Sequence, residues 1–146
     1  MELEQVFPTE FGSFKLKATK DHVHVLRKFT IEDHAWVKTN LGMTIVEVLQ
    51  LGDKDPLEMW EKLSRVIYRL LLDKSPFQKQ TVQTFDEDGE KKTEVMGGPT
   101  LLRLSMAGTR EPTDVMAAFT QCLKESDPVM PVQKKTEENP TPPSQA

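Results

Sequence analysis

Two histidines, His22 and His24, are the first residues along the chain whose type and spacing could support chemistry. Alternate residues of a strand share one face, so both imidazoles could bind the same metal ion. No third ligand follows at a recognisable spacing, and polar residues that alternate with valines are typical of a half-exposed strand. His34 beside Asp33 could form an acid–base pair, but neighbours along a helix point in different directions. We therefore expect neither a metal site nor an acid–base pair here.

A cysteine, an acidic segment and a glycine pair are the remaining candidates. Cys122 lies on an apolar stripe of the last predicted helix, which predicts a buried and inert thiol. The acidic segment 86–90 lacks the ligand pattern of a calcium loop and is predicted to be a turn. Gly97-Gly98 lacks the pattern of a phosphate-binding loop. The sequence thus predicts a protein that is not an enzyme and that binds no cofactor or metal.

Length and composition narrow the class of protein further. The chain has 146 residues, 37% of them hydrophobic, and a net charge of -4. No apolar run approaches the roughly 20 residues of a spanning helix, no signal peptide is evident, and the single cysteine excludes a disulfide scaffold. We expect a cytoplasmic protein that is not secreted and has no membrane partner. The negative charge argues against nucleic acid as a partner.

Period-two patterning predicts a β-hairpin over residues 13–28. Phe14 and Leu16 alternate with lysines, and Val23 and Val25 alternate with the two histidines. Alternation predicts that the apolar set is buried and that the histidines face water. The hairpin also carries a basic patch, which could contact a phosphate backbone or an acidic partner, or simply protect the strand edge. The patch consists of Lys15, Lys17, Lys20, Arg27 and Lys28.

Residues 30–75 are predicted to be helical. Thr30 is a good N-cap, and Ile31, Ala35 and Trp36 are spaced for the apolar face of a helix that ends near Gly42. Residues 43–51 are rich in β-branched side chains and could form a strand. Their position between two glycines favours a short helix.

The clearest predicted helix spans residues 55–73. Asp55 is its N-cap and Pro56 its first helical residue. Its apolar stripe, which belongs in a core, consists of Trp60, Leu63, Ile67 and Leu70. The opposite face pairs Glu58 with Lys62 and Glu61 with Arg65.

The second half of the chain changes character twice. Residues 78–98 are polar and are predicted to form a protruding hairpin or loop around the acidic turn. Residues 99–126 return to a helical pattern, with a short helix before Gly108 and a longer one from about Pro112. Residues 127–146 hold half of the ten prolines and few apolar groups, which predicts a disordered tail.

We therefore predict an α+β, mainly helical fold. An N-terminal β-hairpin packs on a small bundle of four or five helices, with a protruding polar hairpin and a disordered C-terminal tail. Residues 13–126 form a single globular domain, preceded by a flexible arm over residues 1–12.

One segment resembles a known family. The residues are Leu26-Arg27-Lys28-Phe29-Thr30-Ile31-Glu32-Asp33-His34-Ala35-Trp36. In tail assembly chaperones of long-tailed bacteriophages, a strand ends in a similar Leu-x-x-Phe/Leu-Thr phrase before a helix with an acidic residue and a large apolar one. The order of elements is similar over residues 14–75 and, less clearly, 100–125.

The resemblance implies a virion assembly factor in the host cell cytoplasm. Such a chaperone binds the tape-measure protein and helps the tail-tube protein polymerise around it. The chain could also self-associate. Many members are also made as a longer product by ribosomal frameshifting. Lys134-Lys135 could be encoded by a slippery run, or be two solvated lysines.

Adaptable apolar side chains are the expected contacts with such a helical partner. We predict partner-binding roles for Met59, Phe85, Met96 and Met116. A structural protein retained in the virion, such as a tail-completion or head–tail connector component, is the main alternative. A small bacterial enzyme or regulator is a third class, disfavoured because no convergent polar residues are evident.

Overall fold

The computed structural model describes residues 11–20 and 22–126. Within these ranges it contains five α-helices and two separate two-stranded antiparallel sheets. The predicted tail 127–146, and all but residues 11 and 12 of the predicted arm 1–12, lie outside the described residues. The predicted class, α+β and mainly helical, is confirmed.

The N-terminal hairpin forms as predicted, but the buried face of its second strand is the opposite of the predicted one. Strand β1 (Ser13–Lys15) pairs with β2 (Val23–Val25), and a short 3-10 helix η1 (Lys17–Thr19) connects them. The register places Phe14 opposite His24, and both are buried. The prediction that the valines of β2 face inward and the histidines outward is therefore wrong: His24 is 1% exposed and Val23 is 45% exposed.

Helix α2 (Ile31–Leu41) begins and ends where the sequence predicts. Thr30 caps it through a capping box with Asp33, and Gly42 ends it in the left-handed conformation. The buried face differs from the predicted one, because it consists of Asp33, Val37 and Leu41. Ile31 is 61% exposed. The helix is rotated so that a carboxylate, and not an apolar residue, faces inward at its first turn.

Residues 43–51 form a helix and not a strand, as the flanking glycines favour. Helix α3 (Ile45–Gln50) starts at a second capping box, in which Thr44 and Glu47 satisfy each other's backbone amides. The 3-10 helix η2 (Leu51–Asp53) then leads to the N-cap Asp55.

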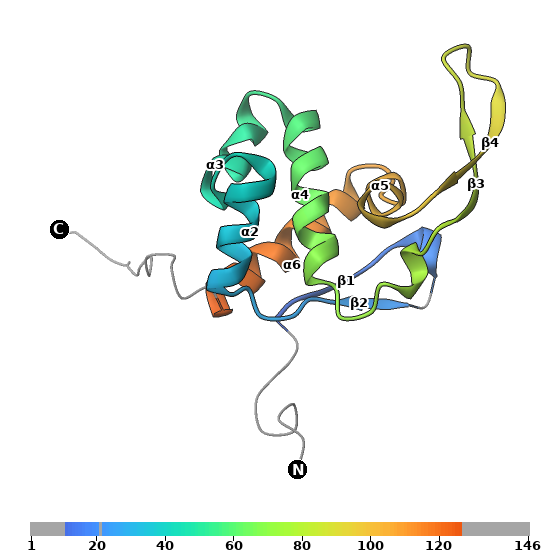
Figure 1. Ribbon diagram of the computed structural model, residues 1–146. Coiled ribbons are helices and arrows are strands. Elements are labelled where there is room, and N and C mark those ends of the chain that lie inside the picture. Colours follow the sequence, from blue (N-terminus) through green and yellow to red (C-terminus); the bar gives the residue numbers. More distant parts are fainter. Residues whose placement is uncertain (1–10, 21, 127–146) are drawn as a thin grey trace.

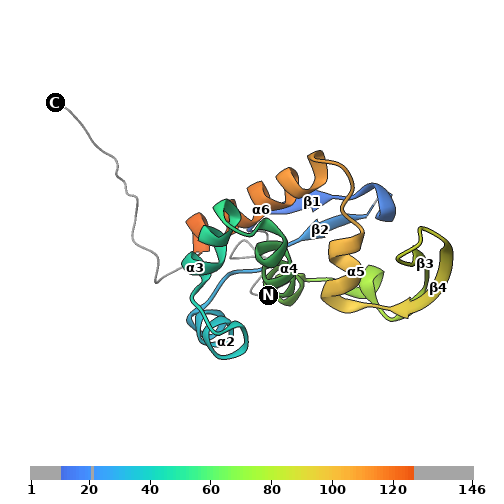
Figure 2. The same ribbon diagram turned by 90° about the horizontal axis from the view of Figure 1, so that it is seen from above.

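Helix α4 (Pro56–Leu70) is central to the fold and lies between α2 and α6 in Figure 2. It ends three residues before the predicted boundary because Leu71 forms an antiparallel bridge with Leu26. Two backbone bonds flank the bridge, from Arg27 N to Leu70 O (2.9 Å) and from Leu72 N to Val25 O (3.0 Å). The end of the N-terminal hairpin is thereby joined to the end of α4.

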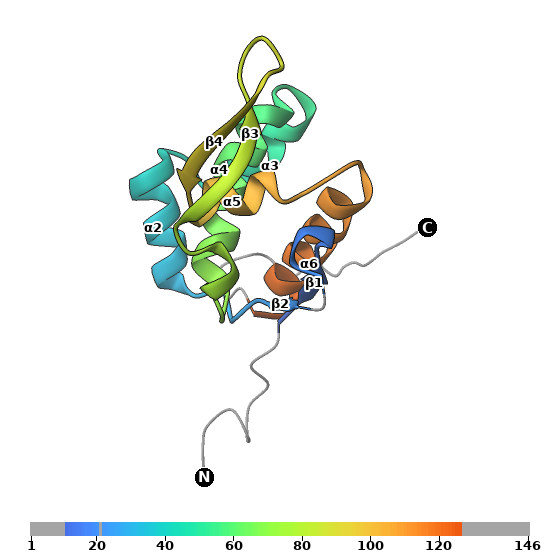
Figure 3. The same ribbon diagram turned by 90° about the vertical axis from the view of Figure 1, so that its right-hand side faces the viewer.

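The polar segment is a β-hairpin that extends away from the helices (Figures 1 and 3). After a 3-10 turn η3 (Ser75–Phe77), strand β3 (Gln80–Phe85) pairs with β4 (Lys91–Met96). Asp86 Oδ1 accepts hydrogen bonds from the backbone amides of Asp88 and Glu90, both at 2.9 Å, so the acidic segment is a turn, as predicted.

Gly97 fixes the base of this hairpin. A Cβ atom at Gly97 would lie 2.8 Å from the Lys79 backbone nitrogen, so only glycine allows the two ends of the hairpin to approach this closely. Helix α5 (Gly98–Leu104) follows at once and packs on α4.

Helix α6 (Arg110–Ser126) lies along the N-terminal hairpin in Figure 2. It starts two residues before the predicted Pro112. Its buried residues include Cys122, which the sequence places on an apolar stripe, together with Val115, Phe119 and Leu123. Gly12 lies against the Ala118 carbonyl oxygen, which leaves no room for a side chain.

One hydrophobic core joins the elements. Phe14, Leu26, Phe29, Leu63, Phe77, Leu102 and Phe119 are among its buried residues. No helix within the described ranges is long and apolar enough to cross a membrane.

Candidate functional site

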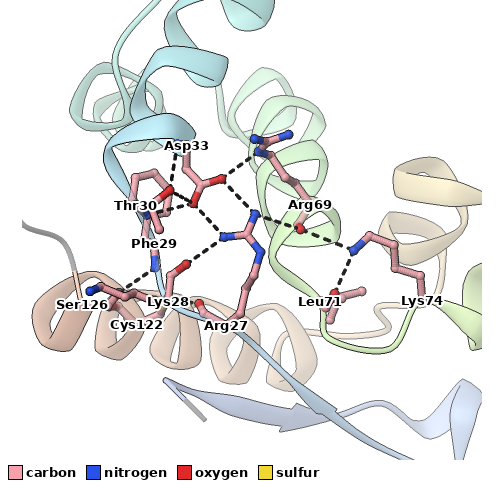
Figure 4. A network of polar contacts seen from close by, with 10 residues as sticks. All are labelled: Arg27, Lys28, Phe29, Thr30, Asp33, Arg69, Leu71, Lys74, Cys122 and Ser126. Atoms are coloured by element: carbon pink, nitrogen blue, oxygen red, sulfur yellow. Dashed lines mark hydrogen bonds and ion pairs between the residues drawn. The ribbon is translucent and has the colours of Figure 1, made fainter. Parts of the chain in front are cut away.

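The carboxylate of Asp33 is the centre of a polar network that joins three segments (Figure 4). Arg27 donates to both carboxylate oxygens, at 2.8 and 2.9 Å, and Arg69 Nε donates to Oδ1 at 2.8 Å. The Thr30 amide and hydroxyl donate to Oδ2 at 2.8 and 2.9 Å. Asp33 is 1% exposed, so a buried charge is held by two guanidinium groups and a helix start.

The network keeps this carboxylate ionised. Burial alone would raise the pKa of the Asp33 carboxyl, but the hydrogen bonds from Arg27, Thr30 and Arg69 outweigh burial and hold the pKa well below its ordinary value. The hydrogen bond between Arg27 and Asp33 also raises the pKa of Arg27. Asp33 is therefore a carboxylate and Arg27 a guanidinium cation at neutral pH.

Above this network lies a cationic groove, which we define by Arg27, Trp36, Arg65, Tyr68, Arg69, Lys74 and Pro99. Its volume is about 530 Å³. The Arg69 and Arg65 guanidinium carbons lie 5.0 and 6.0 Å from the centroid of the Trp36 ring. Lys74 Nζ lies 5.5 Å from the Tyr68 ring. Each aromatic face is thus covered by a cation, which is a favourable arrangement.

Positive charge dominates the cationic groove. Desolvation by burial lowers the pKa of Lys74, and the nearby Arg27 and Arg69 lower it further. Lys74 Nζ donates to the carbonyl oxygens of Leu71 and Arg69, at 2.8 and 3.4 Å, and to no carboxylate within the described ranges. The groove therefore offers hydrogen-bond donors and positive potential to an anionic group.

The projecting hairpin presents a second surface. Cross-strand pairing places Phe85 and Lys91 on the same face as Thr81 and Val95. Phe85 is 64% exposed and Val95 is 62% exposed. The opposite face carries Val82 and Met96, which pack on the core. We call the face that carries Phe85 and Val95 the outer hairpin face.

The four residues predicted to bind a partner do not form one surface. Phe85 is exposed on the outer hairpin face, whereas Met96 is half-buried on the opposite one. Met116 is half-buried on α6. Met59 is 5% exposed inside the core. A side chain buried to this degree offers no surface to a partner, so Met59 does not belong to a binding set.

The histidines and the cysteine are not among the residues that define the cationic groove or the outer hairpin face. His24 packs between Phe14 and Phe77, with ring centroids 5.1 Å from each, and its Nε2 atom lies 2.8 Å from Thr19 Oγ1. His22 pairs with Asp73 at 3.6 Å. Within residues 11–20 and 22–126, no cluster of three or more metal-ligating side chains occurs.

Cys122 is buried, as the sequence predicts. Burial raises the pKa of its thiol, and the hydrogen bonds to Ser126 and to the backbone oppose the rise without reversing it. Asp33 lies in the buried network, and the ring of His34 packs edge-on against Phe29, with the two ring centroids 4.8 Å apart.

Sequence patterns alone do not reveal the cationic groove. Arg65, Tyr68 and Arg69 share one face of α4, and this spacing is the signal that was available. Arg27 and Lys74 lie outside that helix and join the groove only through the fold. No family model, curated protein or solved structure matches the chain.

Proposed function

We propose that the protein is a tail assembly chaperone of a long-tailed bacteriophage. It binds the tape-measure protein in the host cell cytoplasm and assists polymerisation of the tail-tube protein around it. The similarity of residues 26–36 to that family supports the proposal, as does the order of an N-terminal hairpin followed by short helices.

The outer hairpin face is the observation that carries the proposal. Within residues 11–20 and 22–126, most large apolar side chains lie in the core. Phe85 and Val95 are instead exposed, on an element that projects from the body. Exposed aromatic residues on a projecting element are typical of protein-binding surfaces.

A tape-measure protein is long and helical, so an apolar strip on its surface would pack on the outer hairpin face. Two side chains form only a small contact. This suits a chaperone, which must release its client when tail-tube subunits arrive, because small interfaces dissociate quickly.

The direct test is co-expression of the chain with the tape-measure protein of its own genome, followed by co-purification and titration. Replacing Phe85 by Ser and Val95 by Thr should weaken binding by at least about tenfold, the usual loss for a central aromatic contact. Leu57→Ser is the matched control, because Leu57 is 83% exposed on α4 and away from the hairpin. Equal binding by the double variant and the control would contradict the proposal.

Mass spectrometry of purified particles separates the chaperone from a retained virion protein. A chaperone is absent from finished particles, whereas a tail-completion or connector protein is present in stoichiometric amounts. The proposed longer product has its own test. A slippery heptamer at codons 133–135 would support frameshifting near Lys134, and its absence would remove that part of the proposal.

A further inference from the structure

We infer that the cationic groove is a docking site for an acidic segment of a protein partner, held through its Asp or Glu side chains. The inference goes beyond the chaperone proposal and does not depend on it, because it concerns a different surface and rests on charge and geometry.

The positive charges that line the cationic groove are only partly neutralised by a carboxylate of the protein itself. Four of its lining side chains are cationic, namely Arg27, Arg65, Arg69 and Lys74. Two of them, Arg27 and Arg69, already donate to the carboxylate of Asp33. Cations that are gathered without a matching number of carboxylates create a potential that favours an anionic ligand.

Arg65 is the side chain most available to a ligand. The sequence predicts an ion pair between Glu61 and Arg65, but the guanidinium lies over Trp36 instead. Among residues 11–20 and 22–126, it has no hydrogen bond or ion pair. By contrast, the neighbouring pair predicted on this helix does form, with Lys62 Nζ 3.5 Å from Glu58 Oε2.

Arg69 offers a second set of donors. Only its Nε–H group is used by Asp33, so the terminal Nη groups can donate to a ligand. An arginine fork matches the two oxygens of a carboxylate. Arg27 binds Asp33 in this geometry, since its two Nη groups donate to both carboxylate oxygens.

The observations favour a protein segment over nucleic acid. The groove, at about 530 Å³, has room for a few side chains and not for a long backbone track. The chain as a whole carries a net charge of -4, which repels a polyanion of many phosphates more than a segment with a few carboxylates. The aromatic rings of Trp36 and Tyr68 can pack against the methylene groups of Glu and against apolar neighbours.

The test is fluorescence anisotropy with defined probes. One probe is a fluorescein-labelled peptide that repeats Glu-Glu-Leu, and the other repeats Gln-Gln-Leu with the same length. The folded wild-type chain should bind the Glu peptide and not the Gln peptide, and added salt should weaken binding. Arg65→Ala should weaken binding by about tenfold, the loss expected for one charge-assisted hydrogen bond.

Arg110→Ala is the matched control, because it removes the same charge from an exposed arginine that pairs with Asp114 outside the cationic groove. It should bind within about twofold of wild type. Arg65→Gln is a second groove variant, and thermal melting checks that all variants fold. The inference is overturned if the Glu peptide does not bind, if both peptides bind equally, or if Arg65→Ala matches Arg110→Ala. Tighter binding of an oligothymidylate than of the Glu peptide would assign the groove to nucleic acid instead.

Discussion

Asp33→Asn is the substitution that tests the polar network most directly. It removes the charge that Arg27 and Arg69 share while keeping the size of the side chain and an oxygen that can still cap α2. The variant therefore leaves two cations side by side without their carboxylate. Repulsion between them, and the loss of three charge-assisted bonds, should lower the free energy of unfolding.

The expected loss of unfolding free energy follows from how deeply Arg27 and Arg69 are buried. Removing one member of a fully buried ion pair costs about 3–5 kcal/mol. The side chains of Arg27 and Arg69 are each 33% exposed, so water partly compensates them, and we expect a loss at the lower end, about 3 kcal/mol. In urea this corresponds to a fall in the midpoint of about 1.5–2 M, for a typical dependence of about 1.5–2 kcal/mol/M.

Equilibrium urea unfolding, followed by circular dichroism, measures this loss. Asp114→Asn is the control, because Asp114 makes an exposed i,i+4 pair with Arg110 at 3.6 Å that is worth about 0.3–0.5 kcal/mol. In an Arg69→Met background, Asp33→Asn should cost less than in wild type, since the two residues act as one unit. A loss below about 1 kcal/mol, or equal costs in both backgrounds, would refute a shared charge network.

Two further predictions concern His24 and Gly97. Burial, followed by repulsion from His22, lowers the pKa of His24 from 6.5 to about 4. The unfolded chain therefore binds a proton first, so the native state should lose about 3 kcal/mol as pH falls from about 6.5 to 4. Urea titrations at each pH should show a smaller loss for His24→Leu, and parallel curves for the two proteins would contradict the assignment. Gly97→Ala places a Cβ 2.8 Å from the Lys79 nitrogen, and we expect the free energy of unfolding to fall by about 1–3 kcal/mol. An unchanged free energy of unfolding in urea titrations would show that the hairpin base can shift freely.

Local signals in the sequence predicted the elements well. Capping residues located the starts of two helices, at Thr30 and Asp55. Two flanking glycines favoured the short helix between them, and an acidic turn with a glycine located the projecting hairpin. These signals act over three or four residues, so they are visible without knowledge of the fold.

Which side chains face the core was harder to predict, because this depends on contacts with residues that are distant in the sequence. His24 is buried since Phe14, Phe77 and Thr19 surround it, and Asp33 is buried since two distant arginines compensate its charge. Hydrophobic periodicity assigns polar residues to water and therefore fails wherever a polar residue finds such partners. The cationic groove could not be predicted either, because Arg27 and Lys74 join it only through the fold.

The N-terminal hairpin packs on segments of the chain that are synthesised much later. Leu26 bridges to Leu71, and Gly12 rests on the Ala118 carbonyl of α6. The first strands thus leave the ribosome long before the surfaces that bury Phe14 exist, and a two-stranded hairpin alone is barely stable in water. The native environment of these apolar strands is therefore complete only after residues 110–126 have been synthesised.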